Sequence, residues 1–360
     1  MTDEITDRVY GCLVGGAIGD ALGAIVQGWS YEEIRETYGR VEDFTWYDTT
    51  LVPGNPGSVT GDTVVQHYLC LAVAEHGGRI TPDELAEVWQ DHLNPERVWV
   101  NGEMVLLKLQ LGMNPWTTGR ETFPTSEAVM GIAPVGIINA GDPRQAYQDG
   151  FNVSSLNQDG VSRDAGAAVA AGIAAGMVPG ATVDDVLGTI TDYATDTLFC
   201  AIDLTMDLTA DSDSVDEFTE RFYDDMLDWR RTLRWDKQHY YDGKLHSTTV
   251  LEIVPAMIAI LDLCDGDPER SIVEAASFGR QADTIAGLVG NVVGAVHGAS
   301  ALRDDWIDTC EQANRDFFEE VEGTPDANFE SMAHRLVDAL ENERQRSKRR
   351  TDTLTDVLEQ

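Results

Sequence analysis

Three short segments of the sequence combine Gly, Thr and Asp in a way that a binding or catalytic site could use. They are GDALG at 19–23, SVTGDT at 58–63 and GRQADT at 279–284. Short Thr/Asp clusters at helix starts are usually caps, in which a side-chain oxygen accepts a backbone N–H. Two helix starts that each carry an Asp–Thr pair can also direct oxygen ligands at one hard cation, since Mg²⁺ uses carboxylates, hydroxyls and water. Both interpretations stay open at this point.

These segments lie among strong helix signals, and strand signals are almost absent. Ser30, Thr81 and Ser214 each open a capping-box pattern. Asp142 and Asp267 are each followed by Pro, which is favoured at the first position of a helix. Apolar residues at helical spacing follow these starts and predict about a dozen helices.

The organisation of the chain is simple. No Ser/Gly tract or internal repeat marks a boundary, so we expect one all-α domain over residues 1–345. Residues 346–360 predict a basic, mixed-charge C-terminal tail that is solvated and partly frayed. The uncharged stretches 165–183 and 284–302 are Ala/Gly-rich and indicate buried helices rather than membrane spans.

Two of the predicted helices carry Gly where Gly is costly. One has Gly at 11, 15, 19 and 23, and the other has Gly at 287, 290, 294 and 298. Each interior Gly lowers helix stability by about 0.5–1 kcal/mol relative to Ala. Close packing of two central helices would offset this cost. Room for a ligand at the helix ends is the other interpretation, and the two can coexist.

The charge balance excludes some classes of partner. The chain has 25 Lys and Arg against 63 Asp and Glu, a net charge of −38, so general binding to nucleic acid or anionic membranes is not expected. Only 4 of the 25 basic residues are Lys, and this balance is typical of a halophilic protein. The first residues lack the pattern of a signal peptide, and five scattered Cys favour reduced thiols. We expect a soluble cytoplasmic protein.

The chain resembles the ADP-ribosylglycohydrolase family, which includes the dinitrogenase reductase-activating glycohydrolases. The resemblance covers most of residues 7–300 and rests on five motifs: GCLVGGAIGDALG at 11–23, WSYEEI at 29–34, VTGDT at 59–63, IAPVGI at 132–137 and ADTIA at 282–286. It implies a compact orthogonal multi-helix bundle. It also implies cleavage at the anomeric carbon of a ribosyl group, where two adjacent Mg²⁺ or Mn²⁺ ions orient the ribose hydroxyls and a water.

The chain departs from the family pattern at the metal centre. The family has Glu where this chain has Gln27, Asp where it has Gly61 and Asp where it has Gln281. A His that is often found around Gln158 is also absent. Two of the five carboxylates expected at the metal centre remain, so a pair of dications would keep much of its charge uncompensated.

The resemblance then leaves at most one weak Mg²⁺ or Mn²⁺ site, at Thr60, Asp62, Asp283 and Thr284, or no metal at all. In the metal-free case Asp62 or Asp283 acts as general base or stabilises the oxocarbenium ion. Gln27, Gln158 and Gln281 would hydrogen-bond the ribose hydroxyls in either case.

We favour a hydrolase of the N- or O-glycosidic bond of an ADP-ribosyl conjugate or a nucleoside. Three of the four changes are to Gln, an amide that can still hydrogen-bond a diol, which indicates a retained pocket. A non-catalytic paralogue that binds a ribosyl ligand is the alternative. The partner in both cases is a small ribosyl or nucleotide-like molecule, and the sequence does not determine the oligomeric state.

Three further residues are candidates for substrate binding, and a fourth, Asp20, is a candidate for a supporting role. The family lines its pocket near Asp159 and Gly160, although this dipeptide is also a common turn. Arg280 could meet a substrate phosphate or form an ordinary salt bridge. Asp20, inside the first predicted helix, could cap a neighbouring element or support the site.

Overall fold

Two Gly-rich helices pack against each other at the centre of the computed structural model, which describes residues 4–48, 54–226, 239–241, 244–246 and 249–359. They are α1 (Glu4–Ala24) and α16 (Ala282–His297), and nearly all of their residues are buried. A Cβ added at Gly290 would overlap the carbonyl oxygen of Gly15, and one at Gly294 would overlap that of Gly11. The close packing predicted from the Gly spacing is therefore confirmed.

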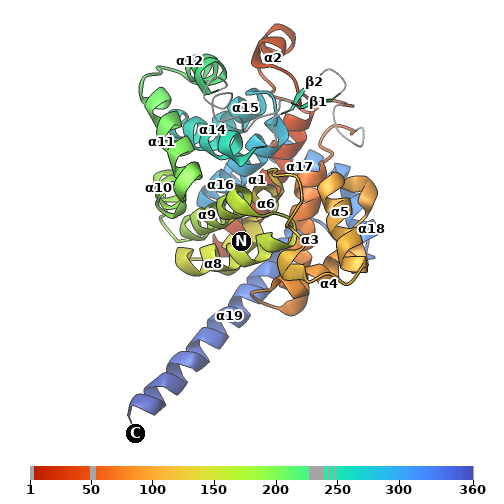
Figure 1. Cartoon of the computed structure of the whole chain (residues 1–360), viewed down its shortest axis with the longest axis vertical. Coiled ribbons are helices and arrows are strands. Elements are labelled where there is room, and N and C mark those ends of the chain that lie inside the picture. The colour runs from red at the N-terminus through yellow and green to blue at the C-terminus, as the bar shows by residue number, and fades with distance from the viewer. Residues whose placement is uncertain (1–3, 49–53, 227–238, 242–243, 247–248, 360) are drawn as a thin grey trace.

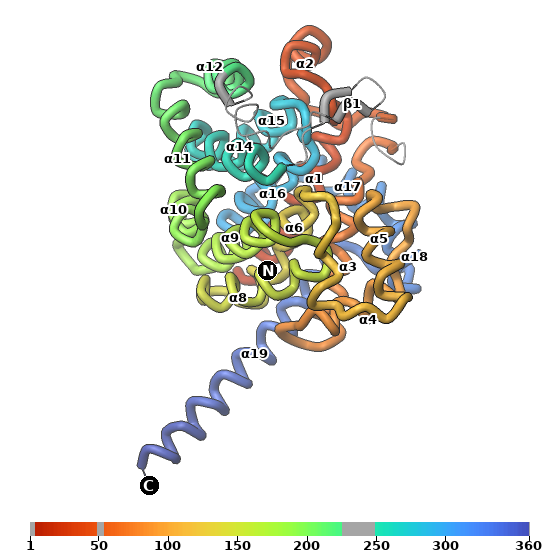
Figure 2. Tube along the Cα trace, in the orientation of Figure 1, coloured from red at the N-terminus to blue at the C-terminus, as the bar shows by residue number. Residues whose placement is uncertain are grey.

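The other elements surround this pair as an all-α body (Figures 1 and 2). The described residues form the following further α-helices: α2 (Tyr31–Thr37), α3 (Gly61–His76), α4 (Pro82–His92), α5 (Val100–Gln110), α6 (Glu127–Met130), α7 (Ala133–Ile138), α8 (Pro143–Val153), α9 (Gly160–Gly176), α10 (Val183–Tyr193), α11 (Asp196–Ala210), α12 (Val215–Arg221), α14 (Val250–Leu263), α15 (Pro268–Ala276), α17 (Asp304–Ala313), α18 (Arg315–Glu322) and α19 (Phe329–Leu358).

Short elements complete the fold. Single turns lie at η1 (Pro95–Arg97), η2 (Pro115–Thr117), η3 (Ser154–Leu156), η4 (Phe222–Met226) and η5 (Ala299–Ala301). Two short strands, β1 (His239–Tyr241) and β2 (Lys244–His246), pair with each other as a small antiparallel hairpin. The hairpin adds an element that the sequence did not predict and leaves the all-α class unchanged.

The predicted helix starts are present. Ser30 and Thr81 form complete capping boxes with the Glu three residues later, and the hydroxyl of Ser214 accepts the N–H of Glu217. Asp142 and Asp267 each precede a Pro, and their carboxylates accept the backbone N–H groups of Gln145 and Arg270. These local hydrogen bonds explain why the sequence located the starts well.

The last helix differs from expectation. The sequence predicts a partly frayed tail from residue 346, whereas α19 continues as a regular helix to Leu358 and projects away from the body (Figure 1).

No helix in the described part of the chain is both long enough and apolar enough to span a membrane.

Candidate active site

The carboxylate of Asp20 fixes the start of α3. Asp20 lies on α1 with 1% of its surface exposed. Its oxygens accept the backbone N–H and the hydroxyl of Thr60 at 3.0 and 2.7 Å, and the same two groups of Thr63 at 3.1 and 2.6 Å. Asp20 therefore caps the neighbouring helix, as one of its two sequence interpretations predicts, and thereby positions Gly61 and Asp62, which lie between the two threonines.

Asp62 lies in the first turn of α3. Its N–H donates to the hydroxyl of Thr60 at 3.3 Å. The residue as a whole is half-buried, but its Oδ2 atom is enclosed, as is Oγ1 of Thr284, and the Thr284 hydroxyl acts on the Asp62 carboxyl by lowering its pKa. Both side chains line a cavity of about 10 Å³ that Asp20 also lines. Such a space holds about one water molecule.

Asp283 lies opposite, in the first turn of α16, with 1% of its surface exposed. One of its oxygens accepts the side-chain N–H of Gln27 at 2.5 Å, and the other accepts the backbone N–H of Thr284 at 2.9 Å. The turn that carries Gln27 is held to the start of α16 by two backbone hydrogen bonds, Gly28 N–H to Arg280 O and Arg280 N–H to Trp29 O.

Burial raises the pKa of these carboxyl groups. Burial and the charge of Asp20 raise the pKa of Asp283 to about 7. Burial and the nearby charge of Asp283 raise the pKa of Asp62 well above its ordinary value. Burial likewise raises the pKa of Asp20, although four hydrogen bonds oppose the shift. The cluster therefore retains protons near neutral pH, as expected for acid–base chemistry.

Comparisons with known proteins decide the family. The family model described as ADP-ribosylglycohydrolase matches residues 1–346. The chain belongs to the ADP-ribosylglycohydrolase family.

Individual proteins resemble the chain more distantly. An uncharacterised protein of Archaeoglobus fulgidus is 25% identical over 88% of this chain and 94% of its own length. The uncharacterised protein YegU of Escherichia coli K12 is 25% identical over 82% of this chain and 90% of its own length. A solved ADP-ribosylglycohydrolase-related protein complex has a TM-score of 0.62 at 17% identity, covering 93% of this chain and 98% of that one. This last likeness shows the shared all-α fold.

The donor atoms do not fit the pair of dications that the family resemblance implies. Both oxygens of Asp283 already accept N–H groups, so Oδ2 of Asp62 and Oγ1 of Thr284 are left facing the small cavity. Among the described residues, no group of three or more His, Cys, Asp or Glu side chains is arranged to hold a metal ion. One carboxylate and one hydroxyl are a poor set for a hard dication, even with added water.

The structure adds Glu127, which sequence reasoning missed. Glu127 opens α6 with 6% of its surface exposed, and burial raises the pKa of its carboxyl to about 8. Its negative charge also acts on Asp62, where it raises the pKa. The sequence held a usable signal, because Glu127 is the one charged residue between Glu121 and Asp142. A single carboxyl in a long uncharged stretch indicates a buried acid.

Two predicted substrate ligands take structural positions instead. The side-chain N–H₂ of Gln158, which is 1% exposed, donates to Oε2 of Glu127 at 3.3 Å and to the hydroxyl of Thr125 at 2.9 Å. The guanidinium of Arg280 is 1% exposed and donates to both oxygens of Glu252, at 2.6 and 3.1 Å. We therefore reassign Gln158 to support of Glu127, and Arg280 to the salt-bridge interpretation.

The remaining predicted ligands lie at two places. Gln281 occupies the N-cap position of α16 as a buried residue, next to the Asp283 segment, and its side chain makes no capping hydrogen bond to the helix. Asp159 and Gly160 are exposed at the start of α9, where the Asp159 carboxylate accepts the N–H of Gly160 at 2.9 Å. They do not line the cavity between Asp62 and Thr284.

The raised pKa of Asp283 predicts how stability depends on pH. The unfolded carboxyl ionises through its ordinary value of 3.8, whereas the folded one keeps its proton up to about 7. The group therefore destabilises the fold increasingly as pH rises from about 4 to about 7. We expect Asp283→Asn to increase the free energy of unfolding by about 4 kcal/mol at pH 8 relative to wild type, and hardly at pH 4.

The measurement is thermal or urea unfolding of both proteins at several pH values. The exposed Asp211 provides the matched control. The difference in unfolding free energy between Asp211→Asn and wild type should not change with pH across this range. Parallel stability curves for wild type and Asp283→Asn would show that Asp283 has an ordinary pKa.

Proposed function

We propose that the protein hydrolyses the N- or O-glycosidic bond of a ribose-containing substrate with carboxyl groups in place of the family's metal pair. The supporting observation is the pairing of Asp62 and Asp283 from two distant helix starts, each with a raised pKa. Family membership supports the reaction class. An ADP-ribosyl conjugate or a nucleoside is the proposed substrate class.

The chemistry of the bond explains why such carboxyls are suited to it. Loss of the leaving group builds positive charge on the ribose, which an ionised carboxylate stabilises. Departure of the leaving group or attack of water also requires a proton to move. A carboxyl with a pKa of about 7, such as that of Asp283, exists in both protonation states at neutral pH.

The exposed surface around Asp62 and Gln27 indicates how a substrate reaches the site. Oδ2 of Asp62 is enclosed, but the residue as a whole and the neighbouring Gly61 keep part of their surface exposed. Gln27 is also half-buried and contacts Asp283. We infer that the ribose enters from this partly exposed side, where the Gln27 amide and the Asp62 carboxyl can meet its hydroxyls.

A substrate panel tests the proposal. Nucleosides, nucleotides and ADP-ribose conjugates are each incubated with the protein and scored for free ribose or released base. Cleavage of at least one class is expected. Binding of ribosyl compounds without any cleavage would instead favour the non-catalytic paralogue, because a binding protein has no turnover to detect.

A metal experiment tests the carboxyl proposal separately. We propose at most one weakly held Mg²⁺ or Mn²⁺, at Asp62 and Thr284 with Thr60 and Asp283 beside them. Elemental analysis of protein purified without chelator, with anomalous diffraction from Mn²⁺-soaked crystals, should find less than one tightly bound ion per chain. Two fully occupied sites about 3.5–4 Å apart would contradict the proposal.

A further inference from the structure

Exposed apolar side chains gather on one segment of the chain. Among the described residues, 15 large apolar or aromatic side chains are exposed, and seven of these lie between Trp99 and Phe123. This segment contains α5 and the loop that follows it, on the outside of the body (Figure 1). A concentration of this kind usually marks a contact with another molecule.

The exposed side of α5 carries a continuous apolar stripe. Val100, Met104, Leu107 and Leu111 follow each other at spacings of four, three and four residues, so they lie along one face of the helix. Val100, Leu107 and Leu111 are 41%, 55% and 73% exposed, and Met104 is partly exposed between them. No charged residue interrupts this stripe.

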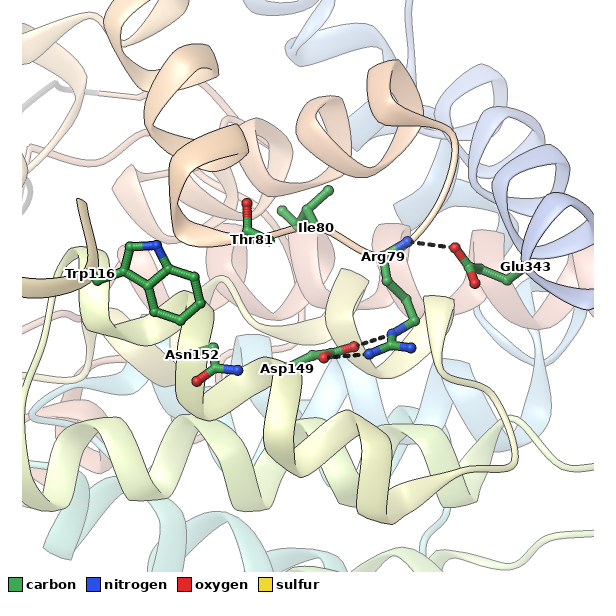
Figure 3. Close-up of a pocket in the computed structure, with 7 residues that line it drawn as sticks. All are labelled: Arg79, Ile80, Thr81, Trp116, Asp149, Asn152 and Glu343. Carbon is green, nitrogen blue, oxygen red and sulfur yellow. Dashed lines mark hydrogen bonds and ion pairs between the residues drawn. The ribbon is translucent and has the colours of Figure 1, made fainter. Parts of the chain in front are cut away.

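Two aromatic side chains extend the stripe at the start of α5. Trp99 is 40% exposed and Phe123 is 54% exposed, and their ring centroids lie 6.1 Å apart. Trp116 is directed elsewhere, because its ring borders a cavity of about 410 Å³ that Arg79 also lines (Figure 3), and its indole N–H donates to Asp83 at 2.7 Å. We call Trp99, Phe123 and the four residues of the stripe the α5 patch.

The α5 patch is large enough for a stable interface. At about 200 Å² for a large side chain, its five exposed side chains present about 500 Å² of surface together. Two copies of the patch therefore remove about 1,000 Å² of apolar surface from water before any polar neighbour is counted. This is the area that a specific interface between proteins requires.

The charge of the segment favours a second copy of this chain as the occupant. Residues 99–123 contain two acidic and two basic residues, whereas the whole chain has a net charge of −38. Two such acidic molecules repel each other over most of their surfaces, so their approach is least opposed where the charge is absent. On α5 itself, Glu103 and the uncharged Gln110 share one flank of the stripe.

The spacing within the stripe also suits a second copy. A two-fold interface is self-complementary, so a residue that contacts another residue must be contacted by it in return. The spacings of four, three and four residues are the same when counted from either end of α5. The stripe therefore matches an antiparallel copy of itself along its whole length.

We propose that the α5 patch joins two copies of this chain in a two-fold symmetric dimer. The two α5 helices run antiparallel, and the axis passes between residues 105 and 106 of both copies. Val100 then packs against Leu111 of the second copy, and Met104 packs against Leu107 of the second copy. Because the flanks also meet in reverse order, the Glu103 carboxylates of the two copies are kept apart.

Sedimentation equilibrium of the full chain in molar KCl, where repulsion between the acidic copies is screened, tests the dimer. A dimer is expected at micromolar concentration, and a monomer would overturn the proposal. Leu107→Glu should weaken dimerisation about 100-fold or more. The reason is that this variant removes one Leu per copy from the interface and places a charge beside the axis.

Leu204 provides the matched control, since it is also an exposed Leu on a helix. It lies on α11 and is 38% exposed, and Figure 1 shows α11 and α5 on opposite sides of the body. Leu204→Glu should leave the dimer intact. Loss of the dimer in Leu204→Glu, or its survival in Leu107→Glu, overturns the proposal.

A covalent test checks the antiparallel register. In a Cys200→Ser background, which removes the exposed native thiol, Val100→Cys with Leu111→Cys should give a disulfide-linked dimer on oxidation. Neither single variant should do so, because the antiparallel pair separates the two copies of either residue by about 16 Å along the helix. Linkage by a single variant, or no linkage by the double variant, would overturn the proposed pairing. Circular dichroism of every variant checks that the fold is retained.

Discussion

Replacing Asp62 by Asn should lower turnover of the ribosyl substrate by about 10²–10⁴-fold and leave the fold intact. Asn keeps the size of the side chain but can neither carry the negative charge nor take up a proton. The backbone N–H of residue 62 still meets the Thr60 hydroxyl, and Asp20 still holds both threonines, so α3 should keep its start. Turnover is measured on whichever class of the panel is cleaved.

A matched variant makes the result specific. Asp304 is also an Asp in the first turn of a helix, α17, but it is exposed and lies outside the small cavity, so Asp304→Asn should keep turnover within about twofold of wild type. Undiminished cleavage by Asp62→Asn would show that the assignment of the site is wrong. An equal loss in both variants would show that the change acts through the fold.

The sequence predicted those features that depend on neighbours in the chain or on a regular period. Ser30, Thr81 and Asp142 cap helices because each needs only the N–H groups two or three residues ahead. The Gly spacing predicted the central pair of helices, since one face of small residues suits a close helix contact. The motifs likewise singled out Asp62 and Asp283, which the fold brings close enough for the charge of Asp283 to raise the pKa of Asp62, while their catalytic role stays a prediction.

The sequence failed where distant segments decide the environment of a side chain. Arg280 is taken up by Glu252, which is 28 residues away in the chain, and Gln158 is held by Thr125 and Glu127 across a packed loop. Glu127 has a raised pKa, and acts on the pKa of Asp62, only because the fold buries it near that residue. Nothing local in the sequence specifies these pairings.

The pair of Gly-rich helices gives the largest expected effect on stability. Gly290→Ala and Gly294→Ala should each lower the free energy of unfolding by about 3 kcal/mol or more. The reason is that the added Cβ would overlap the carbonyl oxygens of Gly15 and Gly11, and both partners are backbone atoms of a fully packed helix that cannot rotate away. Urea unfolding measures the loss, and poor soluble expression is the expected extreme.

Gly287, one turn earlier on the same helix, is the matched control. A Cβ there meets the carbonyl oxygen of Gly16 at 3.5 Å, an ordinary contact. Gly287→Ala should therefore be neutral or raise the free energy of unfolding by about 0.5–1 kcal/mol, the usual helix preference of Ala over Gly. Equal destabilisation by all three variants would contradict close backbone packing as the reason for the Gly spacing. If only the variants at residues 290 and 294 are destabilised, α1 and α16 meet backbone to backbone. This backbone contact holds the Asp20 and Asp283 segments together.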